Sequence, residues 1–251
     1  MQIDALTHAY APGAETLEGI DLTVNPGELV ALVGASGCGK TTLLRLAAGL
    51  LQPERGSVQI DGRLPALARG SLAFVFQEPA LLPWRTVAGN VALGPELAGV
   101  PVRERAGLIA DHLALVGLTD AADKYPHALS GGMRMRASLA RALAGSPRLL
   151  LLDEPFGALD EITRQRLGGE LGRLRAAGGW TALFVTHSAA EAVALAGRVL
   201  VLGGRPGRIV GEVAVPQEEP CGGRAWEDAG FVRTVREVVG LLERAGEGEA
   251  R

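Results

Sequence analysis

The chain has 251 residues, of which 47% are hydrophobic and 21% charged, so a sizeable core is expected and global disorder is not. Its formal net charge of −3 argues against a nucleic-acid binder that relies on a broad basic face. The N-terminus has no charged lead-in before an apolar run, and no stretch approaches the roughly 18 apolar residues of a membrane span. We therefore expect no secretory signal and no membrane span. The two cysteines, Cys38 and Cys221, have no metal-ligand spacing, so we expect a reduced cytosolic chain.

The first seventy residues predict strands and turns around one helix. Apolar alternation over residues 17–24 predicts a strand that ends at the Asn-Pro-Gly turn of residues 25–27. The continuous apolar run of residues 29–33 is typical of a strand covered on both faces. The glycine loop GASGCGKTT follows it and leads into the helical pattern LLRLAAGLL, and residues 56–62 predict a short edge strand.

The middle of the chain changes to a helical pattern. Residues 71–77 predict one more strand, and residues 86–118 then favour helix, with breaks at Gly94-Pro95 and at residues 99–101. We therefore expect a helical subdomain, at about residues 78–146, inserted between two halves of an α/β core.

The core is expected to resume after this insertion. Apolar strands are predicted at residues 148–155, 180–187 and 198–204. A helix is predicted between the first two of them, at residues 161–177. A last helical pattern covers residues 231–244. The predicted organisation is one α/β domain, residues 1–215, followed by a short helical extension, residues 216–251.

The segment from Gly34 to Thr41 fits the phosphate-loop template G-x-x-x-x-G-K-[ST]. Its glycines allow backbone N–H groups to turn inward around a phosphate, and the following helix points its positive end there. Lys40 can reach the β- and γ-phosphates, and the Thr41 hydroxyl is a Mg²⁺ ligand type. The preceding apolar strand and the complete Gly-Lys-Thr ending favour this interpretation over an ordinary glycine turn. Cys38 is interpreted as a backbone donor.

Polar side chains follow the other predicted core strands. Asp153 and Glu154 end an apolar strand, and ligands of open α/β sheets gather at such carboxyl ends. Asp153 suits the Mg²⁺ shell and Glu154 suits polarising an attacking water, whereas without a phosphate loop a capped turn would be the simpler interpretation. Gln77 and His187 also end strands, on the same side, where they can sense the γ-phosphate and the metal.

Two features keep alternative interpretations. Tyr10, before the first turn, either stacks on a base or caps the sheet. Ser130 is a good helix N-cap, and Gly131 and Gly132 expose the first N–H groups of a helix that runs to about Ala144. That helix end either binds an anion or is a simple cap.

The complete set of motifs, in this order and spacing, resembles the ATP-binding subunit of ABC transporters over residues 1 to about 215. The motifs are GASGCGKT, FVFQEP, LSGG, LLLLDEP, GALD and VTHS. The resemblance implies an α/β fold with a RecA-like P-loop NTPase core, an N-terminal antiparallel β subdomain and an inserted α-helical subdomain. It also implies ATP hydrolysis with Mg²⁺.

The resemblance assigns a role to each motif residue. Tyr10 would stack on adenine, and the Walker A loop would comprise Gly34, Ala35, Ser36, Gly37, Cys38, Gly39, Lys40, Thr41 and Thr42. Asp153 would be the Walker B aspartate, and Glu154 the catalytic glutamate. The Mg²⁺-linked glutamine, the D-loop aspartate and the switch histidine would be Gln77, Asp160 and His187. The signature that grips the γ-phosphate held by the opposite subunit would be Ser130, Gly131 and Gly132.

Two further segments resemble the nitrate, sulfonate and taurine branch of bacterial importers, at residues 74–91 and 204–210. This implies a head-to-tail dimer on the cytoplasmic face of the inner membrane, docked on permease subunits that an extracytoplasmic solute-binding protein serves. Pro83 and Trp84 form an apolar knob where the family docks its permease. A soluble ABC ATPase of DNA repair or translation, or a subunit for another solute, is the alternative. Met135 replaces the glutamine usual in this signature one turn into the helix, beyond the anion-binding end. We therefore expect little loss of ATPase activity, and subunit contacts in that turn are left open.

Overall fold

The computed structural model describes residues 1–11, 13–178, 180–216 and 229–247. Cys221 and the last four residues lie outside these ranges, so the expectations for them stay predictions. In the described part of the chain, no helix combines the length and apolarity that crossing a bilayer requires.

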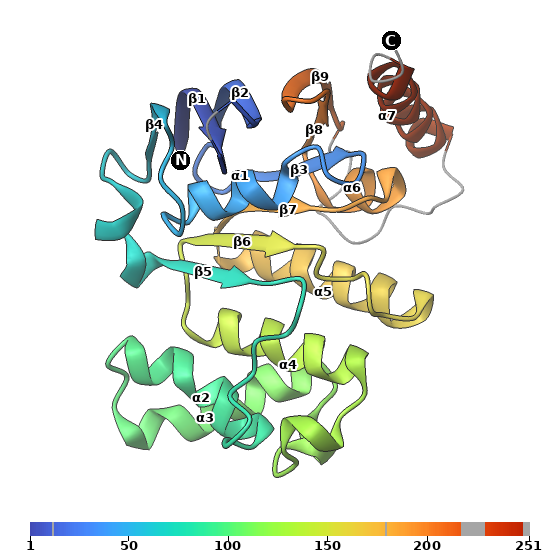
Figure 1. The fold of residues 1–251 in the computed structure, drawn as a ribbon. Helices are drawn as coiled ribbons and strands as arrows, with labels where there is room; N and C mark the ends of the chain where they lie inside the picture. Colours follow the sequence, from blue (N-terminus) through green and yellow to red (C-terminus); the bar gives the residue numbers. More distant parts are fainter. Residues whose placement is uncertain (12, 179, 217–228, 248–251) are drawn as a thin grey trace.

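A six-stranded sheet forms the centre of the molecule, in the order β5-β6-β7-β3-β8-β9 (Figure 1). Its strands are β3 (Leu29–Gly34), β5 (Leu72–Val75), β6 (Leu149–Asp153), β7 (Thr181–Val185), β8 (Arg198–Gly203) and β9 (Arg208–Ala214). The first five run parallel and only β9 pairs antiparallel with its neighbour. Every residue of β3, β6 and β7 is buried, which confirms strands covered on both faces.

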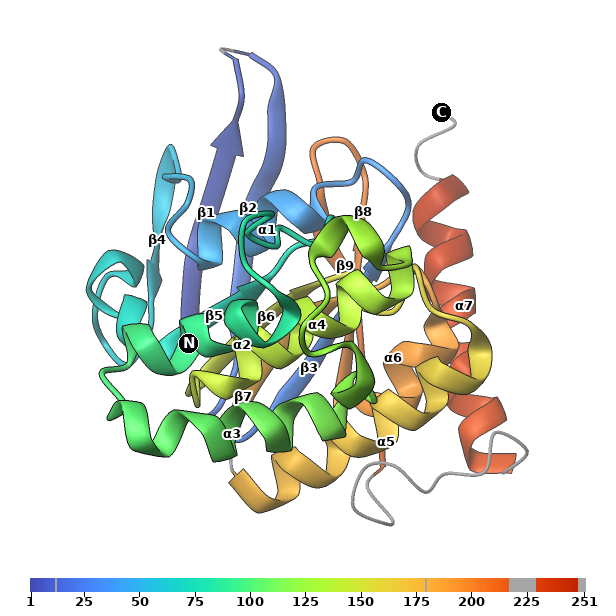
Figure 2. The same ribbon diagram turned by 90° about the horizontal axis from the view of Figure 1, so that it is seen from below.

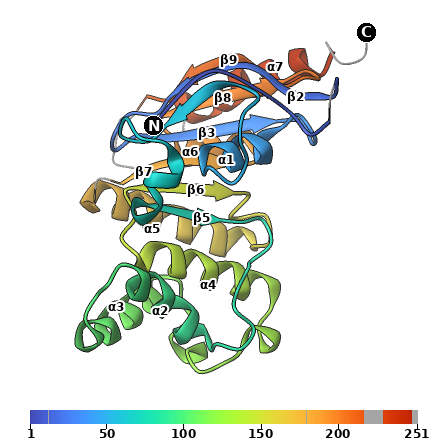
Figure 3. The same cartoon turned by 60° about the vertical axis from the view of Figure 1, so that its left-hand side comes forward.

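A smaller antiparallel sheet of order β2-β1-β4 lies over one face of the central sheet. It consists of β1 (Gln2–Ala9), β2 (Glu15–Thr23) and β4 (Arg55–Gln59), and β4 is the edge strand as predicted. Helix α1 (Lys40–Ala47) lies between the two sheets (Figure 3). Leu43 and Leu44 of this helix are fully buried in one apolar cluster with Leu6 of β1 and Leu32 of β3. Burial of this cluster fixes the phosphate loop, which directly precedes α1.

Helices cover the remaining surfaces. Beyond β5 lie α2 (Val87–Leu97), α3 (Val102–Leu115) and α4 (Gly131–Ala144), while α5 (Glu161–Gly178) and α6 (Ala189–Leu195) cover the second face of the sheet (Figures 1 and 3). Short 3-10 turns are Pro65–Leu67, Arg69–Ser71, Thr119–Ala121 and Pro126–Ala128. Helix α7 (Ala229–Glu247), predicted for residues 231–244, runs beside α6 and β8 with Phe231 and Val238 buried (Figure 2).

The predicted helix break at Gly94-Pro95 is wrong, because α2 continues through both residues. Pro95 lacks one backbone donor and disfavours a helix interior. Packing on α4 overrides this: a Cβ atom at Gly94 would lie 2.7 Å from the Gly145 nitrogen and 2.8 Å from the Arg141 carbonyl oxygen. The absence of a side chain at Gly94 therefore lets α2 approach the end of α4 closely. The second predicted break, at residues 99–101, separates α2 from α3.

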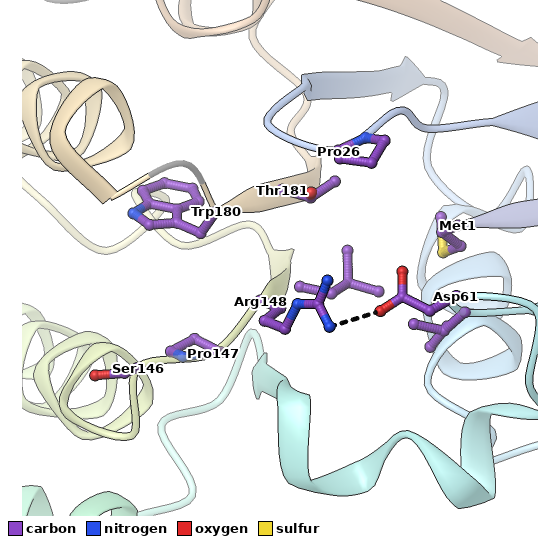
Figure 4. Close-up of a pocket in the computed structure, with 10 residues that line it drawn as sticks. Met1, Pro26, Asp61, Ser146, Pro147, Arg148, Trp180 and Thr181 are labelled. Atoms are coloured by element: carbon purple, nitrogen blue, oxygen red, sulfur yellow. Dashed lines mark ion pairs between the residues drawn. The ribbon is translucent and has the colours of Figure 1, made fainter.

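A polar pocket lies at the amino ends of β6 and β7, away from the phosphate loop (Figure 4). The Arg148 guanidinium faces the Asp61 carboxylate across it, with 3.3 Å between Nη1 and Oδ2. Both side chains are largely exposed, so this ion pair contributes little to stability. Ligands of parallel sheets gather at the opposite, carboxyl ends of the strands.

The close contact between α2 and α4 can be tested by Gly94→Ala. The added methyl group would collide with the backbone of α4, so we expect a loss of about 1–3 kcal/mol in the free energy of unfolding. Gly107→Ala is the matched control, since this α3 glycine is exposed with open space around it and should gain about 0.5–1 kcal/mol. Urea unfolding measures both, and equal stability of the two variants would contradict the packing argument.

Candidate active site

The phosphate loop connects β3 to α1 and curls around the start of that helix. Gly37 and Gly39 have φ angles of 84° and 101°, left-handed values that favour glycine. The Lys40 side chain is buried and its Nζ donates hydrogen bonds to the carbonyl oxygens of Gly34 and Ala35, at 2.8 and 2.7 Å. The ammonium group is therefore held inside the loop, where a phosphate would bind.

A pocket opens over this loop and collects many of the predicted residues. It is lined by Tyr10, Thr16, Ser36, Gly37, Gly39, Lys40, Thr41, Thr42, Gln77 and Glu154. Tyr10 is exposed at its edge, and the phenol oxygen lies 3.2 Å from the Thr42 hydroxyl oxygen. The ring of Tyr10 thus presents a flat apolar surface beside the loop, as stacking on a base requires.

The two acids that end β6 point to different partners. Asp153 is buried, and its Oδ1 accepts a hydrogen bond from the Thr41 hydroxyl at 3.0 Å. Glu154 leaves the strand with φ of 47°, an unusual value for a residue with a side chain, while its N–H donates to the Val185 carbonyl oxygen at 3.0 Å. The two carboxylates therefore have different partners, so each can have its own role.

Glu154 is the point where Gln77 and His187 meet. Its Oε2 accepts a hydrogen bond from Gln77 Nε2 at 3.2 Å, and His187 Nδ1 lies 3.6 Å from the same oxygen. The parallel register of β5, β6 and β7 brings the carboxyl ends of these strands side by side. Strand β5 ends at Val75, so Gln77 stands two residues beyond the strand that was predicted to include it.

The predicted signature residues lie elsewhere in the subunit. The Ser130 hydroxyl accepts a hydrogen bond from the Met133 N–H at 3.3 Å and caps α4. A Cβ at Gly132 would lie 3.2 Å from the Ala158 carbonyl oxygen, so this helix end packs against the segment that contains Asp160. The pocket over the phosphate loop is not lined by Ser130, Gly131 or Gly132 in the described part of the chain.

Asp160 also has a local partner. Its Oδ1 accepts a hydrogen bond from the Thr163 N–H at 2.9 Å at the start of α5. Hydrogen bonds from Thr163 lower the pKa of this exposed carboxyl, so it is ionised at neutral pH. Within one subunit Asp160 caps a helix and does not reach the phosphate loop pocket.

A family model described as ABC transporter matches residues 17–157, which is more than half of the chain. The chain belongs to the ABC transporter family. The α/β core of this ABC protein is an ATP-binding cassette with ATPase activity.

Curated relatives of this ABC protein include importer subunits. A taurine import ATP-binding protein of Mesorhizobium japonicum is 52% identical over 204 residues, which cover 81% of this chain and 79% of the relative. An aliphatic sulfonates import ATP-binding protein of Cupriavidus necator is 47% identical over 230 residues, which cover 89% of this chain and 73% of the relative. A nitrate import ATP-binding protein of Synechococcus elongatus is 47% identical over 78% of this chain, which spans only 30% of that relative.

A solved structure of a dimeric ATP-binding cassette, in a post-hydrolysis state bound to ADP and Pi, superimposes with a TM-score of 0.80. It is 29% identical and covers 86% of this chain and 98% of that chain. The expected fold class, with its antiparallel β subdomain and inserted helices, is confirmed by this likeness and by the arrangement of the sheets.

Met135 of this ABC protein faces its own core. Its side chain is 2% exposed and packs in the same apolar cluster as Leu139 and Val91. This burial favours a packing role within the subunit, and the effect of the replacement on subunit contacts stays a prediction. Methionine is flexible and apolar and fills this interior position.

Two residues that contribute to the site, Thr16 and Glu191, were not predicted from the sequence. Thr16 lines the pocket next to Tyr10, and no motif marks it. Glu191 is buried, forms an ion pair with Arg164 at 3.0 Å and accepts a hydrogen bond from the Thr186 hydroxyl, so it anchors the residue before His187. The Ser-x-x-Glu pattern that begins at Ser188 is a capping-box signature that would have drawn attention to Glu191.

Burial raises the pKa of Asp153 above its usual range, and the nearby Glu154 charge adds to the effect, while the Thr41 hydrogen bond opposes it. A carboxyl whose pKa is higher in the folded than in the unfolded chain favours folding only while it is protonated. That contribution is full below the unfolded pKa and is lost as the pH rises through the folded pKa. At neutral pH the ionised Asp153 therefore costs stability.

Asp153→Asn should raise the melting temperature of the nucleotide-free protein at pH 7. Asparagine keeps the acceptor for Thr41 and removes the buried charge. The gain should shrink as the pH falls toward about 4, where aspartate is protonated in the unfolded chain. Thermal unfolding between pH 4 and 8 measures this, with exposed Asp61→Asn as control. A lower melting temperature for Asp153→Asn at pH 7 would argue against a costly buried charge.

Proposed function

We propose that this chain is the ATP-hydrolysing subunit of a bacterial importer for nitrate, sulfonate or taurine-like oxyanions. The observation that carries the proposal is the contact of Gln77 and His187 with the Glu154 carboxylate beside a phosphate loop. The names of the importer relatives supply the solute class. A subunit for a different solute is the alternative, and the importer names favour transport over DNA repair or translation.

In the proposed site, ATP lies along the pocket with adenine on Tyr10 and the phosphates in the loop. Backbone N–H groups between Gly34 and Thr42 and the amino end of α1 offer donors and a positive dipole to the phosphate oxygens. The Lys40 ammonium adds a full charge at the end of the phosphate chain. The remaining loop members of this site are Ala35, Ser36, Gly37, Cys38 and Gly39.

The residues beside the loop fit Mg²⁺. The Thr41 hydroxyl and the Asp153 carboxylate lie within 3.0 Å of each other, and both are oxygen donors of the kind this ion takes together with phosphate oxygens. The Gln77 amide is the third candidate ligand. When bound, Mg²⁺ would neutralise charge on the β- and γ-phosphates.

Glu154 is the proposed general base. Its Oε2, oriented by the Gln77 amide, would accept a proton from the water that attacks the γ-phosphate. His187, whose side chain is exposed, would contact the γ-phosphate and so report whether it is present. The buried Glu191, paired with the half-buried Arg164, accepts a hydrogen bond from Thr186 and so supports the backbone from which His187 projects.

A second copy of the chain is proposed to complete the site. Ser130, Gly131 and Gly132 lie outside the pocket of their own subunit, and the N–H groups at the start of α4 suit an anion. In a head-to-tail dimer they would close over the γ-phosphate held by the partner, with Asp160 in the same interface. The dimeric cassette structures support this assembly.

The dimer is proposed to bind permease subunits at the cytoplasmic face of the inner membrane, as a peripheral protein. Trp84 is 71% exposed, which suits a contact with the permease. An extracytoplasmic solute-binding protein would supply the solute to the permease. Residues 1–215 would form the ATPase domain, with a helical subdomain at about 78–146, and residues 216–251 a short C-terminal extension.

Glu154→Gln should abolish most hydrolysis and leave ATP binding intact. Removal of a general base lowers the turnover rate by about 10²–10⁴-fold, while the loop still holds the phosphates. The variant should accumulate as an ATP-bound dimer in size-exclusion chromatography. Glu54→Gln, at an exposed position, is the control. Turnover near that of the wild type would remove Glu154 from the role of base.

A mixture of two inactive variants tests the shared site. Gly131→Asp places a charge against the partner's γ-phosphate, yet it has open space in its own subunit and suits a helix start. Lys40→Ala disables the loop. Random pairing leaves one intact composite site in mixed dimers, so ATPase should recover to at most about a quarter of the wild type. If mixing well-folded variants restores no activity, the site is not shared in this way.

A further inference from the structure

The turn between β8 and β9 is docked on the back of the phosphate loop. Gly207 donates a hydrogen bond from its N–H to the Thr16 carbonyl oxygen at 2.9 Å, and its own carbonyl accepts one from the Glu18 N–H at 3.1 Å. A Cβ at Gly207 would overlap the Cys38 carbonyl oxygen, so the two backbones are in direct contact. The turn is thus bonded to β2 and packed directly against the loop at Cys38.

This fixed turn places the exposed Arg205 side chain at the loop. Its Nη2 lies 3.5 Å from the position that a Cβ at Gly37 would occupy, and Gly37 lines the pocket. No carboxylate among residues 1–11, 13–178, 180–216 and 229–247 is paired with Arg205. Arg208, the first residue of β9, is in contrast paired with Glu18 at 2.5 Å.

The pocket is short of positive charge for a triphosphate. Among its described lining residues Lys40 is the single cation, and the carbonyl oxygens of Gly34 and Ala35 hold its ammonium. The Gly37 side of the loop therefore offers neutral donors and no cation among the described lining residues. An unpaired guanidinium beside it lowers the electrostatic energy of a polyanion and can form charge-assisted hydrogen bonds with its oxygens.

We propose that Arg205 is a nucleotide-binding residue that contacts the phosphate chain of ATP held in the loop of the same subunit. The proposal rests on the proposed nucleotide site and adds a second cation to it. The alternative partner of this guanidinium is a carboxylate of the second subunit in the dimer. The contacts of the turn with its own loop favour the phosphate, because they fix Arg205 to this pocket whether or not a partner is bound.

The test compares Arg205→Gln with Arg208→Gln, which removes the same charge three residues further along the chain, at the start of β9. Affinities for ATP, ADP and adenosine are measured by calorimetry at concentrations where size-exclusion chromatography shows monomers. Arg205→Gln should raise the Kd for ATP and ADP about three- to tenfold and leave adenosine unchanged. Arg208→Gln should bind all three like the wild type, because its exposed ion pair contributes little. Arg205→Lys should recover part of the loss, and the wild-type advantage should fall at high salt.

Three results would overturn the proposal. One is an unchanged Kd for ATP in Arg205→Gln. A second is an equal loss for adenosine, which would indicate a distorted pocket. A third is normal monomer affinity with weakened ATP-dependent dimerisation, which would assign Arg205 to a carboxylate of the second subunit. The proposed nucleotide site itself fails only if the wild type binds no ATP or if Lys40→Ala binds it normally.

Discussion

The hydrogen bond from the Thr41 hydroxyl to the Asp153 carboxylate joins the two halves of the nucleotide site. The two residues are 112 positions apart in the chain, and only the parallel order of β6, β7 and β3 brings the loop before α1 to the end of β6. The carboxylate is buried, and burial of a charge is costly unless it is compensated. Thr41 and the attraction of Lys40 compensate part of that cost. A buried carboxylate that lowers the stability of the fold is expected at a site where function requires it.

The left-handed backbone at Glu154 gives the second acid its separate position. A strand continued for one more residue would place the side chain on the face opposite to Asp153, away from the end of β5. With φ of 47° and the N–H bonded to Val185, the chain turns early and brings the carboxylate to Gln77 and His187. Such a conformation costs of order 1–3 kcal/mol and persists only where the surroundings support it. The hydrogen bonds with Val185 of β7 and with Gln77 provide that support.

The sequence predicted the central strands and the phosphate loop well, because fully buried strands are continuous apolar runs and the loop has a fixed template. The predictions from the sequence failed where contacts between distant elements determine the structure. The helix continues through Gly94-Pro95 because α4 packs there, and the burial of Met135 inside its own subunit was not predicted. The contact of Arg205 with the loop depends on a turn fixed by backbone hydrogen bonds, for which no side-chain pattern exists.

The separation of the signature from the phosphate loop has a physical consequence in the proposed assembly. The amino end of α4 is capped by Ser130 and packed against the segment of Asp160, so it cannot turn toward the pocket of its own subunit. Its remaining N–H groups can therefore bind phosphate only when a second copy approaches. A ligand that binds the dimer better than the monomer stabilises the dimer by mass action. ATP then holds the subunits together as long as the γ-phosphate is present. In this assembly, hydrolysis with Glu154 as the proposed base would remove that contact, so the residue proposed to activate the water would also set the lifetime of the closed dimer.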